Sequence, residues 1–122
     1  MIDTSILIDY FRKTDKTNSK LVSHFTEFDV IYISCITEFE IFNGSSDIHK
    51  KFWQTLLERM IVLDFDRKSA RKAADIVTQL KNKRKSIDKP DLFIAATACT
   101  SGLTLDTLNK KHFTHIEDLS LF

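Results

Sequence analysis

Apolar residues follow two alternating patterns along the chain. Short uninterrupted apolar runs are typical of buried strands, and longer stretches with an apolar residue at every third or fourth position are typical of amphipathic helices. The runs predicted as strands are Met1–Asp3, Asp29–Ser34, Met60–Phe65, Leu103–Thr107 and Leu119–Phe122. The stretches predicted as helices are Ser5–Lys13, Asn18–Glu27, Thr37–Asn43, Ile48–Arg59, Arg67–Lys83 and Pro90–Ser101. This alternation predicts an α/β fold in which helices cover a mostly parallel sheet.

Composition narrows the class of protein further. The 122 residues are 43% hydrophobic and include ten Phe, so we expect one domain, residues 1–122, with a single core. No apolar run approaches the roughly 18 residues of a membrane span, and the start lacks the basic region of a signal peptide. Cys35 and Cys99 lack the spacing of a metal motif or a disulfide framework, which favours reduced thiols and a cytoplasmic location. The net charge of +1 argues neither for nor against a polyanionic partner.

Three acidic residues have a purely structural explanation when each is taken alone. Asp91 stands near the third position of a predicted helix, after Asp88 as N-cap. Glu40 follows Thr37 by three residues, which is the spacing of a capping box. Asp3 can cap the helix that follows the first strand.

Together, the same three acids indicate a metal site. Helices that cover a parallel sheet begin at the carboxyl edge of its strands, so Asp3, Glu40 and Asp91 are expected to converge there. Carboxylates gathered in this way repel one another unless a cation lies between them. An all-oxygen donor set suits Mg²⁺ or Mn²⁺, and such ions activate water and polarise phosphoryl groups. The pattern therefore predicts phosphate chemistry.

Four segments of the chain carry a family resemblance. They are IDTSILIDYF, ISCITEFEIFNG, DKPDLFIAATACTSGLTL and TLNKKHF. In order and spacing these segments resemble the motifs of PIN-domain nucleases of the VapC toxin type, over almost the whole chain. The resemblance implies a three-layer α/β/α fold with roughly five strands. It also implies a Mg²⁺- or Mn²⁺-dependent endoribonuclease, neutralised by a VapB-like antitoxin in a type II toxin–antitoxin system.

Carried over position by position, the resemblance assigns the site. Asp3 and Asp91 look like the principal metal ligands, and Glu40 either completes the ligand set or orients a metal-bound water. Whether one or two ions bind is left open. The hydroxyls that resemble those flanking the family's site belong to Thr4, Ser5 and Thr107. Asp9, in another turn of the first helix, is not expected to be a ligand.

The chain departs from the family pattern at two places. The fourth acidic position falls on Asn109, which can hydrogen-bond a water or a phosphate but carries no charge. Asp106 stands where the family usually has an apolar residue. It either supplies the carboxylate that Asn109 lacks or is an exposed strand-edge residue, and we favour the second interpretation. The resemblance also implies a few more residues before Asp3, so the first strand is expected to be short.

Basic and aromatic side chains have two interpretations each. Lys81, Lys83, Arg84 and Lys85 in KNKRK, with Lys89, either contact RNA phosphates or form a solvated helix end. For Lys110 and Lys111 we favour substrate contact. A solvent-facing helix surface is favoured for Arg67, Lys68, Arg71 and Lys72. The apolar side chains interpreted as core, or else as an antitoxin groove or dimer seam, are Phe39, Phe42, Phe52, Trp53 and Leu56. His112 and His115 are expected at the surface, and His24 without a polar partner.

The prediction is therefore a homodimeric, VapC-like endoribonuclease that acts on structured RNA such as tRNA. The alternative is a catalytically weak or inactive PIN-fold module that binds RNA or protein, with Asn109 and the short first strand as its causes.

Overall fold

Two of the predicted strands form a regular sheet. The computed structural model describes residues 1–122. Strands β1 (Tyr32–Ser34) and β2 (Ile61–Leu63) pair in parallel, with Ile33 opposite Val62. The other three predicted strands are reduced to single parallel bridges, so a parallel α/β arrangement is found but a five-stranded sheet is not.

The missing strands still lie side by side as extended chain. Ile2 bridges Asp106, and Leu105 bridges Leu121. Backbone hydrogen bonds of 2.9 Å connect Ile2 to Tyr32 on one side and Met1 to Asp106 on the other. The first segment is short because a helix begins at once: Asp3 is already its N-cap residue. Residues 1–3 therefore lie between β1 and residues 105–106.

All six predicted helices are present, with ends displaced by at most two residues. They are α1 (Thr4–Arg12), α2 (Lys20–Glu27), α3 (Cys35–Gly44), α4 (Lys50–Leu57), α5 (Arg67–Asn82) and α6 (Lys89–Thr100). Three 3₁₀ turns accompany them, at Lys16–Asn18 (η1), Asp47–His49 (η2) and Lys110–His112 (η3). No helix combines the length and the apolar composition that crossing a bilayer requires.

The predicted cap of α3 is wrong. The Ser34 hydroxyl accepts a hydrogen bond from the Ile36 N–H (3.0 Å), so the helix begins two residues before the predicted Thr37–Asn43. Thr37 is buried inside α3, and Glu40 lies in the second turn rather than at the helix start. Glu40 therefore has no capping role.

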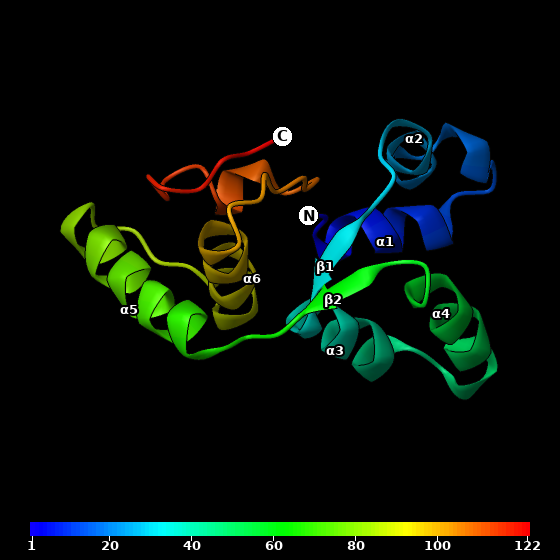
Figure 1. Cartoon of the computed structure of the whole chain (residues 1–122), viewed down its shortest axis with the longest axis horizontal. Coiled ribbons are helices and arrows are strands. Elements are labelled where there is room, and N and C mark those ends of the chain that lie inside the picture. Colours follow the sequence, from blue (N-terminus) through cyan, green and yellow to red (C-terminus); the bar gives the residue numbers. More distant parts are fainter.

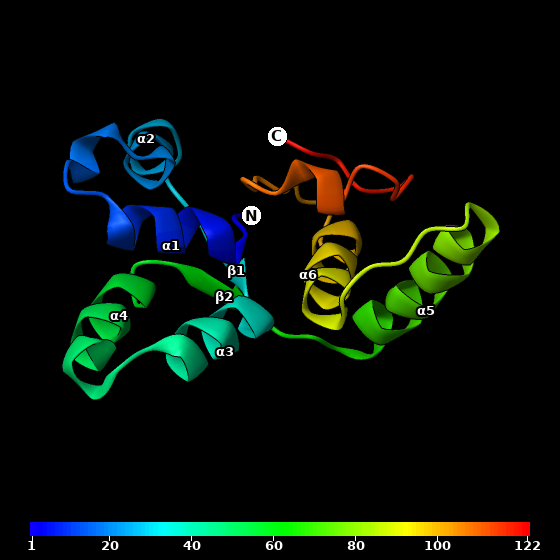
Figure 2. The same ribbon diagram turned by 180° about the vertical axis from the view of Figure 1, so that it is seen from behind.

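Two hydrophobic clusters flank the strands. The first cluster contains residues from helices α1, α2, α3 and α4 and from β1, with Ile6, Ile33 and Trp53 among them. The second contains residues from α5, α6 and the C-terminal segment, with Ile94 and Phe113 among them. Figure 1 shows α1–α4 on one side of the β1–β2 pair and α5 and α6 on the other, and the reverse view in Figure 2 shows the same division.

The aromatic and thiol side chains are divided between core and surface. Trp53 and Leu56 are buried, as the core interpretation predicts, whereas Phe39 is 63% exposed and is not core. Phe42 and Phe52 pack against the first cluster from its margin. Cys35 and Cys99 are both free thiols, as expected.

Asp106 is buried in an ion-pair network, which contradicts the exposed edge position predicted for it. Its carboxylate accepts hydrogen bonds from the Lys20 ammonium (2.8 Å) and lies 2.6 Å from His24 Nε2, so His24 does have a polar partner. Burial opposes ionisation, but the contacts and charges of Lys20 and His24 outweigh it and hold the pKa of Asp106 below its ordinary value. The network fastens α2 to the strand segment at residues 105–106.

We expect Asp106→Asn to lower the free energy of unfolding at pH 7 by about 1–3 kcal/mol, because hydrogen bonds to charged groups contribute roughly that much. A depressed pKa means that this stabilisation is fully present above about pH 4 and is lost as the pH falls further. Urea unfolding at pH 7 and at acid pH measures both effects. Asp29→Asn, at an exposed position, is the matched control. A pH-independent difference between parent and variant would contradict the ion-pair interpretation.

Candidate functional site

A cleft of about 550 Å³ opens between the two halves of the molecule. The predicted site residues come to it from four places: the start of α1, the middle of α3, the start of α6 and the segment after Thr107. The residues that line it are Asp3, Thr4, Ser5, Ile8, Asp9, Arg12, Lys13, Glu40, Asp91, Leu108 and Asn109. The structure thus brings Asp3, Glu40, Asp91 and Asn109 together, whereas Asp106 faces a different cavity.

None of the three acidic side chains is used to cap a helix. Asp3 and Asp91 stand at the N-cap and the third position of their helices, yet no backbone N–H donates to either carboxylate. Asp88, the N-cap of α6, also makes no side-chain cap bond. Asp3 and Glu40 accept hydrogen bonds from hydroxyls, and Asp91 contacts a histidine. Helix capping therefore does not account for these three residues.

Asp3 is held by two hydroxyls from opposite ends of the chain. It is 3% exposed, and its Oδ2 accepts hydrogen bonds from Ser5 Oγ (2.9 Å) and from Thr107 Oγ1 (2.7 Å). Thr107 Oγ1 also accepts from the Asn109 N–H (3.0 Å), and Ser5 Oγ accepts from the Leu108 N–H (3.0 Å). The position of Asp3 is therefore coupled to the segment that carries Asn109.

Burial and the neighbouring carboxylates raise the pKa of Glu40 and of Asp91. Burial raises the pKa of Glu40, and the charges of Asp3 and Asp91 raise it further against the opposing hydrogen bond from Thr4 Oγ1 (2.7 Å). Burial and the charge of Asp3 likewise raise the pKa of Asp91, against the contact with His112. Burial is thus the largest cause of both shifts, and the neighbouring carboxylates add to it.

His112 contacts the site, which the sequence analysis missed. Its Nδ1 lies 3.1 Å from Asp91 Oδ2, although the ring is 43% exposed. The η3 turn, for which Asn109 is the N-cap, brings the histidine back toward α6. The only signal in the sequence was that His112 follows Asn109 by three residues. This spacing brings His112 to the site only because residues Lys110–His112 form a turn.

Arg12 and Lys13 are further residues that sequence reasoning missed. They line the cleft from the end of α1, with Asp9, whose carboxylate lies 3.8 Å from Lys13 Nζ. Ser5, Asp9 and Arg12 are spaced by four and three residues, which places them on one face of a helix. Periodicity from Ser5 could have found this face, which brings Asp9 to the cleft although it is not expected to be a ligand.

The donor set fits a hard divalent cation in its chemistry. Asp3, Glu40 and Asp91 supply oxygen ligands, and no His or Cys stands among the four predicted residues. The carboxylates contact Thr4, Ser5 and His112 in this structure, and no three His, Cys, Asp or Glu side chains form a ready ligand cluster.

The chain belongs to the PIN domain family, because the family's model matches residues 1–119. Among curated proteins it is 32% identical to Ribonuclease VapC1 of Methanocaldococcus jannaschii, over 99% of this chain and 83% of that protein. It is also 32% identical to Ribonuclease VapC1 of Rickettsia felis, over 99% of this chain and 92% of the relative. The resemblance to the VapC type is thereby confirmed.

Solved structures give the same likeness in three dimensions. VapBC2 from Rickettsia felis, bound to a DNA fragment from its promoter, contains a chain with a TM-score of 0.83 and 28% identity, over 100% of this chain and 96% of that one. VapBC-1 from nontypeable Haemophilus influenzae contains one with a TM-score of 0.84 and 28% identity, over 100% and 95%. The predicted PIN fold is confirmed by these neighbours.

We expect Thr4→Val to raise the pKa of Glu40 further, because burial and the neighbouring charges then act without the opposing hydroxyl. A pH titration of the glutamate carboxyl signals by ¹³C NMR measures the shift. Thr4→Ser keeps the hydroxyl and should titrate like the parent. Equal pKa values for Glu40 in all three proteins would show that the Thr4 contact does not influence its ionisation.

Proposed function

We propose that this protein is a VapC-like toxin, a metal-dependent endoribonuclease that hydrolyses RNA phosphodiester bonds. The observation that carries the proposal is the convergence of Asp3, Glu40 and Asp91 on one cleft, with none of them engaged in capping. Membership of the PIN family and the similarity to VapC ribonucleases support the same reading.

Asp3 and Asp91 are the residues that would hold Mg²⁺ or Mn²⁺, with Glu40 as a third ligand or as the group that orients a water. When bound, such an ion supplies Lewis acidity to a phosphoryl oxygen and lowers the pKa of a water. Burial first, and then the neighbouring carboxylates, raise the pKa of Glu40 and Asp91, and the second of these causes supports a cation at this place.

The remaining polar groups have positioning roles in this proposal. Ser5 and Thr107 fix the orientation of the Asp3 carboxylate, and Thr4 fixes that of Glu40. Asn109 lines the cleft with an uncharged amide, which can donate to a phosphate oxygen or accept from a water. It thus replaces a fourth negative charge by a group that does not repel the substrate.

The substrate we propose is structured RNA such as tRNA, and the partner is a VapB-like antitoxin. The solved neighbours are VapBC assemblies, which supports an antitoxin that covers this chain. We further propose a homodimer, for which the exposed apolar side chains Phe39 and Ile48 offer contact surface. Light scattering of the purified chain tests the dimer, and a monomer at all concentrations would exclude it.

The purified chain should cleave RNA at discrete positions in Mg²⁺ or Mn²⁺. Asp3→Asn and Asp91→Asn should each reduce the rate at least about 100-fold, because metal-assisted stabilisation of the transition state amounts to several kcal/mol. Sequencing the ends of fragments from total RNA measures cleavage and identifies the substrate.

A chelator and Asp29→Asn serve as controls for that experiment. Asp29 is exposed and outside the cleft, so its substitution makes the same chemical change without touching the site. A folded, metal-bound parent that leaves all RNA intact would favour the non-catalytic module, with the uncharged Asn109 as its cause.

Mn²⁺ should raise the melting temperature of the parent chain. At a metal concentration about 100 times Kd, the gain corresponds to ~2.7 kcal/mol of unfolding free energy. Asp91→Asn should abolish the gain. Thr107→Val should weaken metal binding about 10-fold, since groups that orient a ligand contribute that much, whereas Thr107→Ser keeps the hydroxyl and the affinity. A metal-induced gain that survives Asp91→Asn would place the ion elsewhere.

A further inference from the structure

A second hollow adjoins the carboxylate cleft at Asp91. It has a volume of about 390 Å³ and lies between the end of α5, the start of α6 and the η3 turn. Asp91 lines both cavities, so they meet at this residue. The basic residues of the second hollow, which we call the basic hollow, are Arg84, Lys85, Lys111, His112 and His115.

The permanent cations of the basic hollow are not neutralised within the chain. Arg84, Lys85 and Lys111 are exposed, and none forms an ion pair. Their neighbour Lys83 is different: its ammonium lies 2.9 Å from Glu117 and belongs to a structural contact. The hollow also contains Asp88, besides Asp91 at its border, so three fixed positive charges face two carboxylates.

The backbone brings these cations to the basic hollow from two elements. Arg84 follows the cap of α5 with φ 57°, in the left-handed region where glycine is usual. Its N–H donates to the Lys81 carbonyl (3.0 Å), and the Lys85 N–H donates to the Leu80 carbonyl (2.8 Å), so the chain turns sharply at the helix end. Lys111 reaches the same hollow from η3. An arginine here accepts a conformational cost that a glycine would avoid.

We infer that the basic hollow binds backbone phosphates of the RNA on one side of the scissile bond. This inference rests on the proposed function, because it extends the substrate path from the carboxylates past Asp91. Among polyanions RNA is favoured because the hollow shares Asp91 with the cleft in which a phosphodiester would react. It also resolves the two readings of KNKRK: Arg84 and Lys85 contact substrate, and Lys83 does not.

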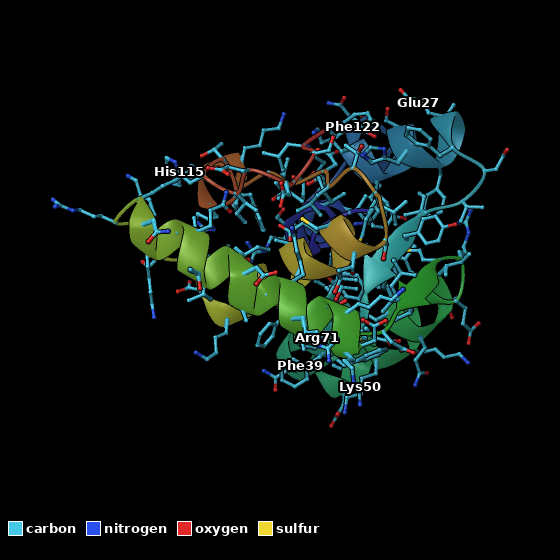
Figure 3. The ribbon with its side chains drawn as sticks, turned by 60° about the vertical axis from the view of Figure 1, so that its left-hand side comes forward. Glu27, Phe39, Lys50, Arg71, His115 and Phe122 are labelled. Carbon is cyan, nitrogen blue, oxygen red and sulfur yellow. The ribbon has the colours of Figure 1, made fainter.

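The test is RNA binding in chelator, where cleavage is prevented. The probe is a fluorescein-labelled single-stranded RNA of mixed sequence, and its anisotropy gives the binding constant at several KCl concentrations. The variant Arg84→Gln/Lys85→Gln removes two charges from the basic hollow. The matched control, Lys68→Gln/Arg71→Gln, removes the same two residue types from the first turns of α5. Figure 3 shows Arg71 near one end of α5, whereas His115, which lines the basic hollow, lies near the other end.

We expect the hollow variant to bind more weakly and to reduce the slope of log K against log salt by about 1.4, since each single-strand phosphate contact contributes about 0.7. The control should bind like the parent. Lys111→Gln lies on a different element, so it tests the same hollow if the double variant fails to fold. Its slope should fall by about 0.7.

The outcomes separate this inference from the proposed function. If the parent cleaves RNA but hollow and control variants bind equally, the basic hollow is not a phosphate site and the nuclease proposal stands. If the parent does not cleave RNA in either metal, the nuclease proposal fails, whereas a selective loss of binding in the hollow variants still supports the RNA path.

Discussion

The pairing of residues 1–3 with residues 105–107 is the constraint on which the site depends. These two short segments lie where the two hydrophobic clusters meet, with Ile2 in one cluster and Leu105 in the other. Only a few backbone hydrogen bonds join them, and the Asp106 contacts with Lys20 and His24 reinforce the junction from α2. A buried charged network at this place carries a desolvation cost, which its short contacts with Lys20 and His24 offset.

The candidate site inherits its geometry from that junction. Asp3 and Glu40 belong to the half that contains α1 and α3, while Asp91 and Asn109 belong to the other half. A small displacement between the halves would change every distance across the cleft. The Thr107 hydroxyl bond to Asp3 crosses the junction directly, so the same segments that hold the halves together also set the position of a proposed ligand.

What the sequence could predict was local in nature. Helix periodicity places all six helices to within two residues. The family resemblance predicts which residues lie together in the cleft, namely Asp3, Glu40, Asp91 and Asn109. The extent of the sheet was not predictable, because apolar runs do not reveal how many residues of an extended segment pair in a regular ladder, and residues 103–107 and 119–122 form only single bridges. The partners of Asp106 and the contact of His112 with Asp91 were missed because they join residues 82, 86 and 21 positions apart, beyond the reach of any local pattern.

In the proposed function, the layout of charge around Asp91 separates two tasks, metal binding and RNA binding. Carboxylates attract a metal ion but repel RNA phosphates, so a purely acidic site would impede its own substrate. Asn109 reduces that repulsion by one charge, and cations stand to both sides: Arg12 and Lys13 on α1, and the basic hollow beyond Asp91. The substrate's distant phosphates can then supply binding energy that holds the reacting phosphate among the acids. In the proposed function, affinity for RNA and affinity for metal therefore belong to different residues, so a substitution in the basic hollow should change the first without loss of the second.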